Sequence, residues 1–152
     1  MTTININGVA HVMLSVASFA AAREFYGWLL PAMGMTPVCD TEKLFYCVGG
    51  RTAIGIQPAT ESGRFEQGGV GLHHLCLRAR SRDDIDRLHE LLREMGATIV
   101  QAPQEGTWAP GYYSVLFEDP DGIRLEANFV PGAGVLAPGV SFDPSAGYQS
   151  QG

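Results

Sequence analysis

Three side chains that lie far apart in the sequence combine the groups that a divalent metal ion prefers. His11 and His74 supply imidazole nitrogens, and Glu126 supplies a carboxylate. Two imidazoles and one carboxylate suit a first-row metal ion and leave coordination positions open for water and a substrate. A single histidine on a strand is more often an ordinary packed or surface residue. The prediction of a metal site therefore depends on the three residues occupying equivalent places in the fold.

Two of these residues lie in segments where apolar and polar side chains alternate, the pattern of a β-strand with one buried face. Residues 9–16 place Ala10, Val12, Leu14 and Val16 on one face and His11 on the other. Residues 123–130 place Glu126 opposite their apolar side chains. Both segments therefore predict a strand that turns its polar group away from the apolar core.

The segment 71–78 predicts a third strand of this kind, bounded by glycine on one side and serine on the other. Leu75 and Leu77 mark the buried face, so His74 points the opposite way. His73 shares a face with the two leucines. We therefore expect His73 to be packed or at the strand edge, and we assign it no ligand role.

The order of predicted elements repeats along the chain. The expected elements are strands at 9–16, 36–39, 44–48 and 52–57 with a helix from 18 to about 30, then strands at 71–78, 98–101, 112–117 and 123–130 with a helix that begins after Ser81 and ends at Gly96. The segments 11–16 and 74–79 are also similar to each other. The sequence therefore predicts an α+β fold of tandem βαβββ modules.

The domain boundaries follow from this repeat. We expect an N-terminal extension at 1–8, a first module at 9–58, a linker at 59–70, a second module at 71–130 and a Gly/Pro-rich C-terminal tail at 131–152.

Composition excludes several classes of partner. The 152 residues contain 10 Lys and Arg against 16 Asp and Glu, a formal charge of -6, which argues against binding to nucleic acid or to an anionic membrane surface. No apolar run approaches the roughly 20 residues that span a bilayer. The 3 cysteines show no CxxC spacing and predict neither a disulfide framework nor a structural zinc site. We expect a cytoplasmic protein that acts on a small molecule.

The segment 112–126, together with His11 and His74, resembles the vicinal oxygen chelate superfamily, which includes glyoxalases, bleomycin resistance proteins and extradiol dioxygenases. The resemblance covers about residues 9–130. It implies mixed sheets curled around a metal-binding cleft, and one divalent ion (Ni, Co, Zn, Mn or Fe) held by His11, His74 and Glu126. It also implies a homodimer.

The sequence departs from one part of this pattern. Glyoxalase I-type members have a fourth protein ligand, a glutamate on the last strand of the first module. Here the matching position is Gly55 or Gln57, so the expected site has three protein ligands.

The resemblance implies a metal-dependent glyoxalase-like enzyme of the lyase or isomerase type, which activates a small substrate through vicinal oxygens with Glu126 as general base. Two alternatives stay open. One is an extradiol-type Fe(II) ring-cleaving dioxygenase, and the other is a protein that sequesters a drug or natural product, as bleomycin resistance proteins do. The residues expected to line the substrate pocket are Met13, Gln57, Cys76, Arg78, Trp108, Tyr112 and Arg124.

Overall fold

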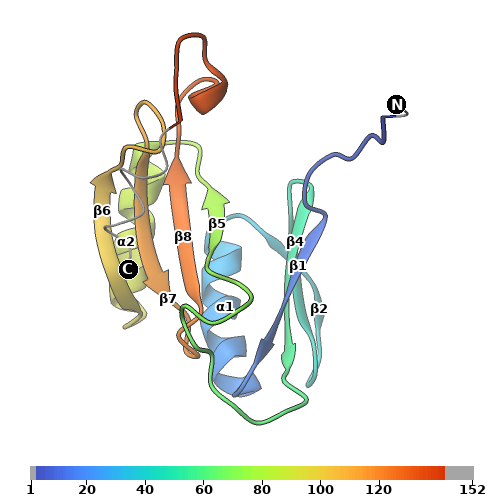
Figure 1. Cartoon of the computed structure of the whole chain (residues 1–152). Coiled ribbons are helices and arrows are strands. Elements are labelled where there is room, and N and C mark those ends of the chain that lie inside the picture. Colours follow the sequence, from blue (N-terminus) through green and yellow to red (C-terminus); the bar gives the residue numbers. More distant parts are fainter. Residues whose placement is uncertain (1–2, 143–152) are drawn as a thin grey trace. The chain divides into compact units, whose positions relative to one another are not determined.

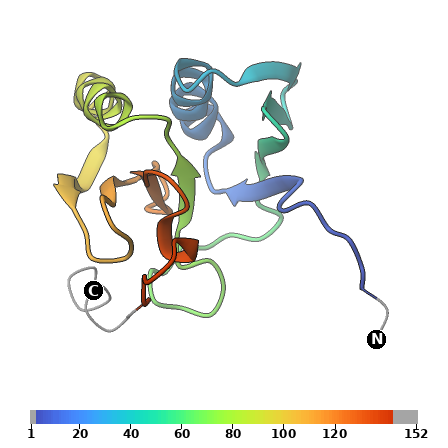
Figure 2. The ribbon, with the colours of Figure 1, turned by 90° about the horizontal axis from the view of Figure 1, so that it is seen from above.

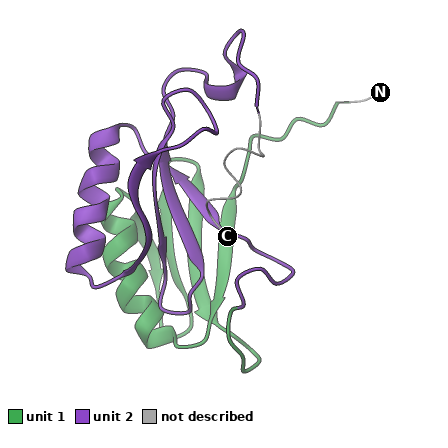
Figure 3. Ribbon diagram, turned by 60° about the vertical axis from the view of Figure 1, so that its left-hand side comes forward, with its two compact units in different colours: residues 1–65 green, residues 66–152 purple. Residues whose placement is uncertain are grey.

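The computed structural model describes residues 3–142, which form parts of two compact units. Unit 1 is Met1–Phe65 and unit 2 is Glu66–Gly152 (Figure 3). The predicted C-terminal tail lies partly outside the described residues, which end at Phe142. Among the described residues, each unit contains one α-helix and one four-stranded mixed sheet, so the predicted α+β tandem is confirmed.

Unit 1 follows the order strand, helix, three strands (Figure 1). Its elements are β1 (His11–Val16), α1 (Phe19–Ala32), β2 (Thr36–Asp40), β3 (Phe45–Gly49) and β4 (Thr52–Pro58). The strand order in the sheet is β1-β4-β3-β2, with β1 parallel to β4 and the other pairs antiparallel. β1 and β4 can run parallel because α1 connects β1 to β2 at the opposite edge of the sheet, and the chain then returns through β3 to β4.

Unit 2 repeats this topology. Its elements are β5 (Leu75–Arg78), α2 (Arg82–Glu94), β6 (Thr98–Glu105), β7 (Tyr113–Glu118) and β8 (Arg124–Phe129), followed by a short 3-10 helix, η1 (Gly134–Leu136). The strand order is β5-β8-β7-β6, and again only the first pair is parallel. The two sheets are therefore equivalent strand for strand, β1 with β5 and β4 with β8.

Both helices begin at the serines that the sequence predicts. The Ser18 hydroxyl accepts a hydrogen bond from the Ala21 backbone N–H at 3.4 Å, and the Ser81 hydroxyl accepts one from the Asp84 N–H at 3.1 Å. Ser81 also donates to the Asp84 carboxylate at 2.7 Å. The two bonds from backbone N–H groups satisfy donors that have no partner inside the helix.

Each helix packs on one face of its own sheet, as Figure 2 shows from above. In β1, Leu14 and Val16 are buried on the helix side, whereas His11 and Met13 are exposed. In β5, Leu75 and Leu77 are half-buried, whereas Cys76 and Arg78 are exposed. The polar face of the equivalent strands β1 and β5 is thus opposite the helix, as the alternation predicts.

The turn between β7 and β8 is fixed by Asp119, which is only 5% exposed. Its Oδ1 accepts hydrogen bonds from the backbone N–H groups of Asp121 and Ile123, each at 2.9 Å. Gly122 adopts φ +83°, which L-residues rarely tolerate. This turn sets the register in which Glu118 lies opposite Arg124.

Two strands differ from the prediction by more than two residues at one end. The strand expected from residue 71 begins only at Leu75, because the preceding chain turns at Gly71, whose φ is +138°. The strand expected at 98–101 extends to Glu105, with two register shifts against β7. Within residues 3–142, neither helix has the length and apolar character needed to cross a membrane.

Candidate metal centre

The centre of unit 2 contains a buried carboxylate. Glu126 lies in the middle of β8 and is only 2% exposed. An ionised carboxylate removed from water is costly unless charged or hydrogen-bonding groups surround it. The partners of Glu126 therefore decide what this residue can do.

Both carboxylate oxygens have partners. The Tyr112 hydroxyl donates to Oε1, and the Nε2 of His74 lies 3.2 Å from Oε2. Burial by itself would raise the pKa of Glu126, but hydrogen bonds from His74, Tyr112 and Ser114 and the electrostatic attraction of His74 hold the pKa below its usual value. Glu126 is therefore a fixed, ionised carboxylate at neutral pH.

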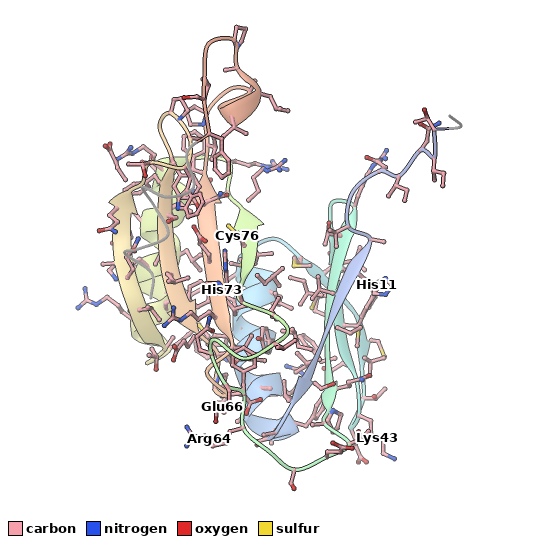
Figure 4. All side chains as sticks on the ribbon, in the orientation of Figure 1. His11, Lys43, Arg64, Glu66, His73 and Cys76 are labelled. Atoms are coloured by element: carbon pink, nitrogen blue, oxygen red, sulfur yellow. The ribbon has the colours of Figure 1, made fainter. Side chains whose placement is uncertain are left out.

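His74 is held at both of its ring nitrogens. Its Nδ1 lies 2.8 Å from the Nδ1 of His73, while its Nε2 faces Glu126. The His74 side chain remains 31% exposed. Figure 4 labels His73 on the segment that leads into β5, and Cys76 on that strand. The prediction that His73 faces away from His74 is wrong, because the strand geometry on which it depended begins only at Leu75.

The Tyr112 hydroxyl and the Cys76 thiol both contact this carboxylate. Burial raises the pKa of the Tyr112 hydroxyl, and its hydrogen bond to Glu126 raises it further. Removal from water also raises the pKa of the Cys76 thiol. The charge of Glu126 and the hydrogen bond between the thiol and Glu126 raise this pKa further. Both groups therefore stay protonated at neutral pH and can donate to the carboxylate.

The donors His74 and Glu126 fit a divalent metal ion. Two donors bound to one first-row ion at about 2.0–2.2 Å lie about 3.0–3.5 Å apart, and the observed separation of 3.2 Å falls within this range. Within residues 3–142, however, no three His, Cys, Asp or Glu side chains gather closely enough to hold an ion. The structure thus brings two of the predicted ligands together, and the third, His11, belongs to unit 1.

The equivalent position in unit 1 is occupied differently. Met13 pairs in register with Gly55 on β4, as Cys76 pairs with Glu126 on β8. Of the two positions considered for a fourth ligand, Gly55 is therefore the equivalent of Glu126. A Cβ at Gly55 would lie 2.6 Å from the Met13 sulfur and 2.6 Å from the Tyr46 ring. His11 is exposed on β1 (Figure 4). Because Gly55 has no side chain, β4 supplies no carboxylate at the position equivalent to Glu126.

The other predicted pocket residues are less closely connected to the carboxylate. Gln57 and Arg78 are exposed near the ends of their strands. The Arg124 Nε lies 3.7 Å from Glu118, its cross-strand neighbour. Trp108 packs against the Phe142 ring, with centroids 5.7 Å apart. Among the seven predicted pocket residues, the structure brings Cys76 and Tyr112 to Glu126.

Sequence reasoning missed three residues at this centre. Ser114 is 2% exposed and bonds to Glu126, and the Asn128 side chain bonds to Tyr112. Ser114 and Asn128 also lie opposite each other in the β7–β8 register. The two-residue spacing from Tyr112 to Ser114 could have identified Ser114. The third, His73, gave no such signal.

Comparisons with known proteins agree with this fold. The uncharacterized protein YqjT of Bacillus subtilis (strain 168) is 28% identical over 76% of this chain and 94% of its own length. A solved structure from Bacillus halodurans, described as a candidate glyoxalase, has a TM-score of 0.72 at 25% identity and covers 80% of this chain and 95% of its own.

Lactoylglutathione lyase from Agrobacterium tumefaciens has the same fold, with a TM-score of 0.62 at 21% identity over 82% of this chain and 94% of its own. The family model for the Glyoxalase/Bleomycin resistance protein/Dioxygenase superfamily matches residues 8–127, which contain both sheets except for the end of β8. With the duplicated topology and the predicted motifs, this match shows that the chain belongs to the Glyoxalase/Bleomycin resistance protein/Dioxygenase superfamily.

Proposed function

We propose that the protein is a metal-dependent enzyme of the lyase or isomerase type that activates a small substrate through two adjacent oxygen atoms. His74 and Glu126 hold the ion, and His11 is the third ligand, supplied by the same chain or by a second copy. The observation that carries the proposal is the buried Glu126 carboxylate, held ionised with its Oε2 3.2 Å from the Nε2 of His74.

A bound divalent ion supplies Lewis acidity, which stabilises negative charge on substrate oxygens. Glu126 serves as general base and takes a proton from the substrate at Oε2, the oxygen that faces His74, when this oxygen is not bound to the ion. Its other oxygen remains bonded to the Tyr112 hydroxyl. Tyr112 therefore keeps the carboxylate oriented while the proton moves.

Elemental analysis of protein purified without added metal tests this proposal. We expect nickel, cobalt, zinc or manganese at a defined ratio in the wild type, and loss of the metal in His74→Ala and His11→Ala. His89→Ala is the matched control, because His89 lies within α2 and makes no contact with Glu126 that the described residues show. A wild-type protein that binds no divalent ion would contradict the proposal and favour a sequestering protein.

Mixing two variants determines which chain supplies His11. If a second copy supplies it, His11→Ala and His74→Ala form mixed dimers in which one site has all its ligands. Refolding the variants together then restores part of the metal binding. If each chain builds its own site, the mixture binds no more metal than either variant alone.

A second candidate, ring cleavage by Fe(II) and O₂, is favoured by one observation. Gly55 provides no fourth ligand, and two histidines with one carboxylate are typical of non-haem Fe(II) oxygenases. Oxygen uptake with a panel of catechols, after anaerobic iron loading, distinguishes this reaction from the first. Uptake that requires iron supports ring cleavage, and no uptake with any catechol supports the lyase or isomerase.

A further inference from the structure

We propose that His73 is a positioning residue of the metal centre, which fixes the orientation and the tautomer of His74 through their Nδ1 atoms. This inference rests on the proposed function, since it assumes that His74 binds the ion. The two Nδ1 atoms are 2.8 Å apart, a hydrogen-bonding distance. The rings meet edge to face, with an interplanar angle of 77°.

The contact leaves one arrangement of protons when His74 binds an ion. A neutral imidazole carries one N–H and one acceptor nitrogen. The Nε2 of His74 faces Glu126, so this nitrogen must offer its lone pair to the ion. His74 then carries its proton on Nδ1 and donates it to the Nδ1 of His73. His73 must therefore carry its own proton on Nε2.

The backbone of His73 is held in place independently of its ring. The Gln67 side chain donates a hydrogen bond to the His73 carbonyl at 2.9 Å. The chain between them turns at Gly69, whose N–H donates to the Glu66 carbonyl at 3.0 Å. The Nδ1 of His73, which accepts the hydrogen bond from His74, therefore belongs to an anchored segment just before β5. An anchored partner of this kind can orient a metal ligand.

A direct ligand role for His73 is the competing explanation. Its Nδ1 is directed to His74, however, and the carboxylate oxygen nearest the pair is bonded to His74. Binding an ion through Nδ1 of His73 would break the contact between the rings. The two explanations differ in what an asparagine at this position should do, because its Oδ1 is as many bonds from Cα as the histidine Nδ1.

Affinity for Co²⁺, measured by competition with a chelating dye, tests the inference. His73→Phe keeps a ring but removes the acceptor, and should weaken binding by about 10- to 100-fold, the usual cost of losing an outer partner of a ligand. His73→Asn restores an acceptor and should recover most of this loss. His89→Phe, the matched control, should bind like the wild type. Thermal unfolding without metal verifies that each variant is folded.

The tautomer gives a readout that a merely structural role would not change. In ¹⁵N spectra of the protein loaded with Zn²⁺, we expect His73 protonated at Nε2 and His74 protonated at Nδ1. A His73 protonated at Nδ1 would overturn the inference. So would a His73→Phe variant with wild-type affinity, or a His73→Asn variant that loses as much affinity as His74→Ala, which would make His73 a ligand. A wild-type protein that takes up no Co²⁺ would instead overturn the proposed function, and this inference with it.

Discussion

Unit 1 and unit 2 each place a histidine two residues before an equivalent strand position, His11 before Met13 and His74 before Cys76, but the neighbouring strand differs between them. In unit 2, Cys76 pairs with a buried, ionised Glu126. In unit 1, Met13 pairs with Gly55, and the space that a side chain would need there is filled by Met13 and Tyr46. The pairing of Met13 with Gly55 is equivalent to that of Cys76 with Glu126, so the difference at this point lies in the side chains.

This difference separates two roles that a duplicated scaffold can carry. Unit 2 surrounds its carboxylate with hydroxyl, thiol and imidazole groups, each of which bonds to it. Unit 1 places a thioether and an aromatic ring at the equivalent point, groups that contribute contact area rather than charge. One unit is thus equipped for ionic chemistry, whereas the other offers a single histidine beside an apolar surface.

Removing the charge that distinguishes unit 2 should have the largest effect. Glu126→Gln keeps the size of the side chain but removes the negative ligand. Losing an outer partner of a ligand costs at most about 100-fold in affinity, so losing this ligand should weaken Co²⁺ binding by more than that. Glu118→Gln is the control, since Glu118 is a half-buried glutamate on the neighbouring strand that pairs with Arg124. Wild-type affinity in Glu126→Gln would show that the two units do not differ in metal chemistry.

The support of the carboxylate can be tested through acid sensitivity. Because the pKa of Glu126 is below its ordinary 4.5 in the folded protein, the ionised carboxylate stabilises the fold above that pH. This stability is lost as the pH falls through the lowered pKa. Tyr112→Phe removes one hydrogen bond to the carboxylate and should cost about 1.5–3 kcal/mol at pH 7.

Urea unfolding of the metal-free protein at pH 7 and at pH 3 measures both effects. The pKa of Glu126 in Tyr112→Phe should rise, so the stability lost between the two pH values should be smaller than in the wild type. Tyr113→Phe is the control, because its hydroxyl bonds to the exposed Asp86. An unchanged acid dependence in Tyr112→Phe would remove Tyr112 from the network.

In unit 1, the close packing at Gly55 predicts a steric effect. Gly55→Ala should destabilise the fold by about 1–3 kcal/mol, since a Cβ would overlap Met13 and Tyr46. Met13→Ala in the same chain should recover part of this loss. Gly63→Ala is the control, because a Cβ there meets nothing within 4 Å. Additive effects of the two changes in urea unfolding would contradict the packing described for unit 1.

The smallest effect concerns the thiol of Cys76. Because removal of the thiol from water, and then the Glu126 charge, raise the pKa of Cys76, it should react slowly with iodoacetamide at pH 8 although part of the residue is exposed. Glu126→Gln should speed the reaction by about tenfold for each unit by which the thiol pKa falls. Mass spectrometry of the peptide that contains Cys76 measures the rate, with Cys39 as the internal reference. Equal rates in both proteins would show that the carboxylate does not act on the thiol.

Much of this architecture could be predicted from the sequence because it follows local rules. Alternation placed His11 opposite the buried Leu14, and the serine caps marked the start of both helices. The similarity of the segments beginning at His11 and His74 predicted the tandem. The structure adds the register, which identifies Gly55 as the counterpart of Glu126.

The rest depended on contacts that no local pattern contains. The alternation rule put His73 on the wrong side, because it assumed a strand where the chain is still turning at Gly71. The bonds to Glu126 on β8 come from Tyr112, just before β7, and from Ser114 on β7, so they require the β7–β8 register. The role of Tyr46 in filling the space at Gly55 likewise arises only when the strands are paired.

The turn held by Asp119 makes the chemistry of unit 2 sensitive to changes in chain length. Side chains on a strand switch faces with every residue, so a single amino acid inserted after Asp119 would turn Leu125 toward the polar groups and Glu126 toward the helix. The short hairpin that precedes Glu126 should therefore tolerate substitutions more readily than insertions, because a substitution leaves the alternation of β8 unchanged.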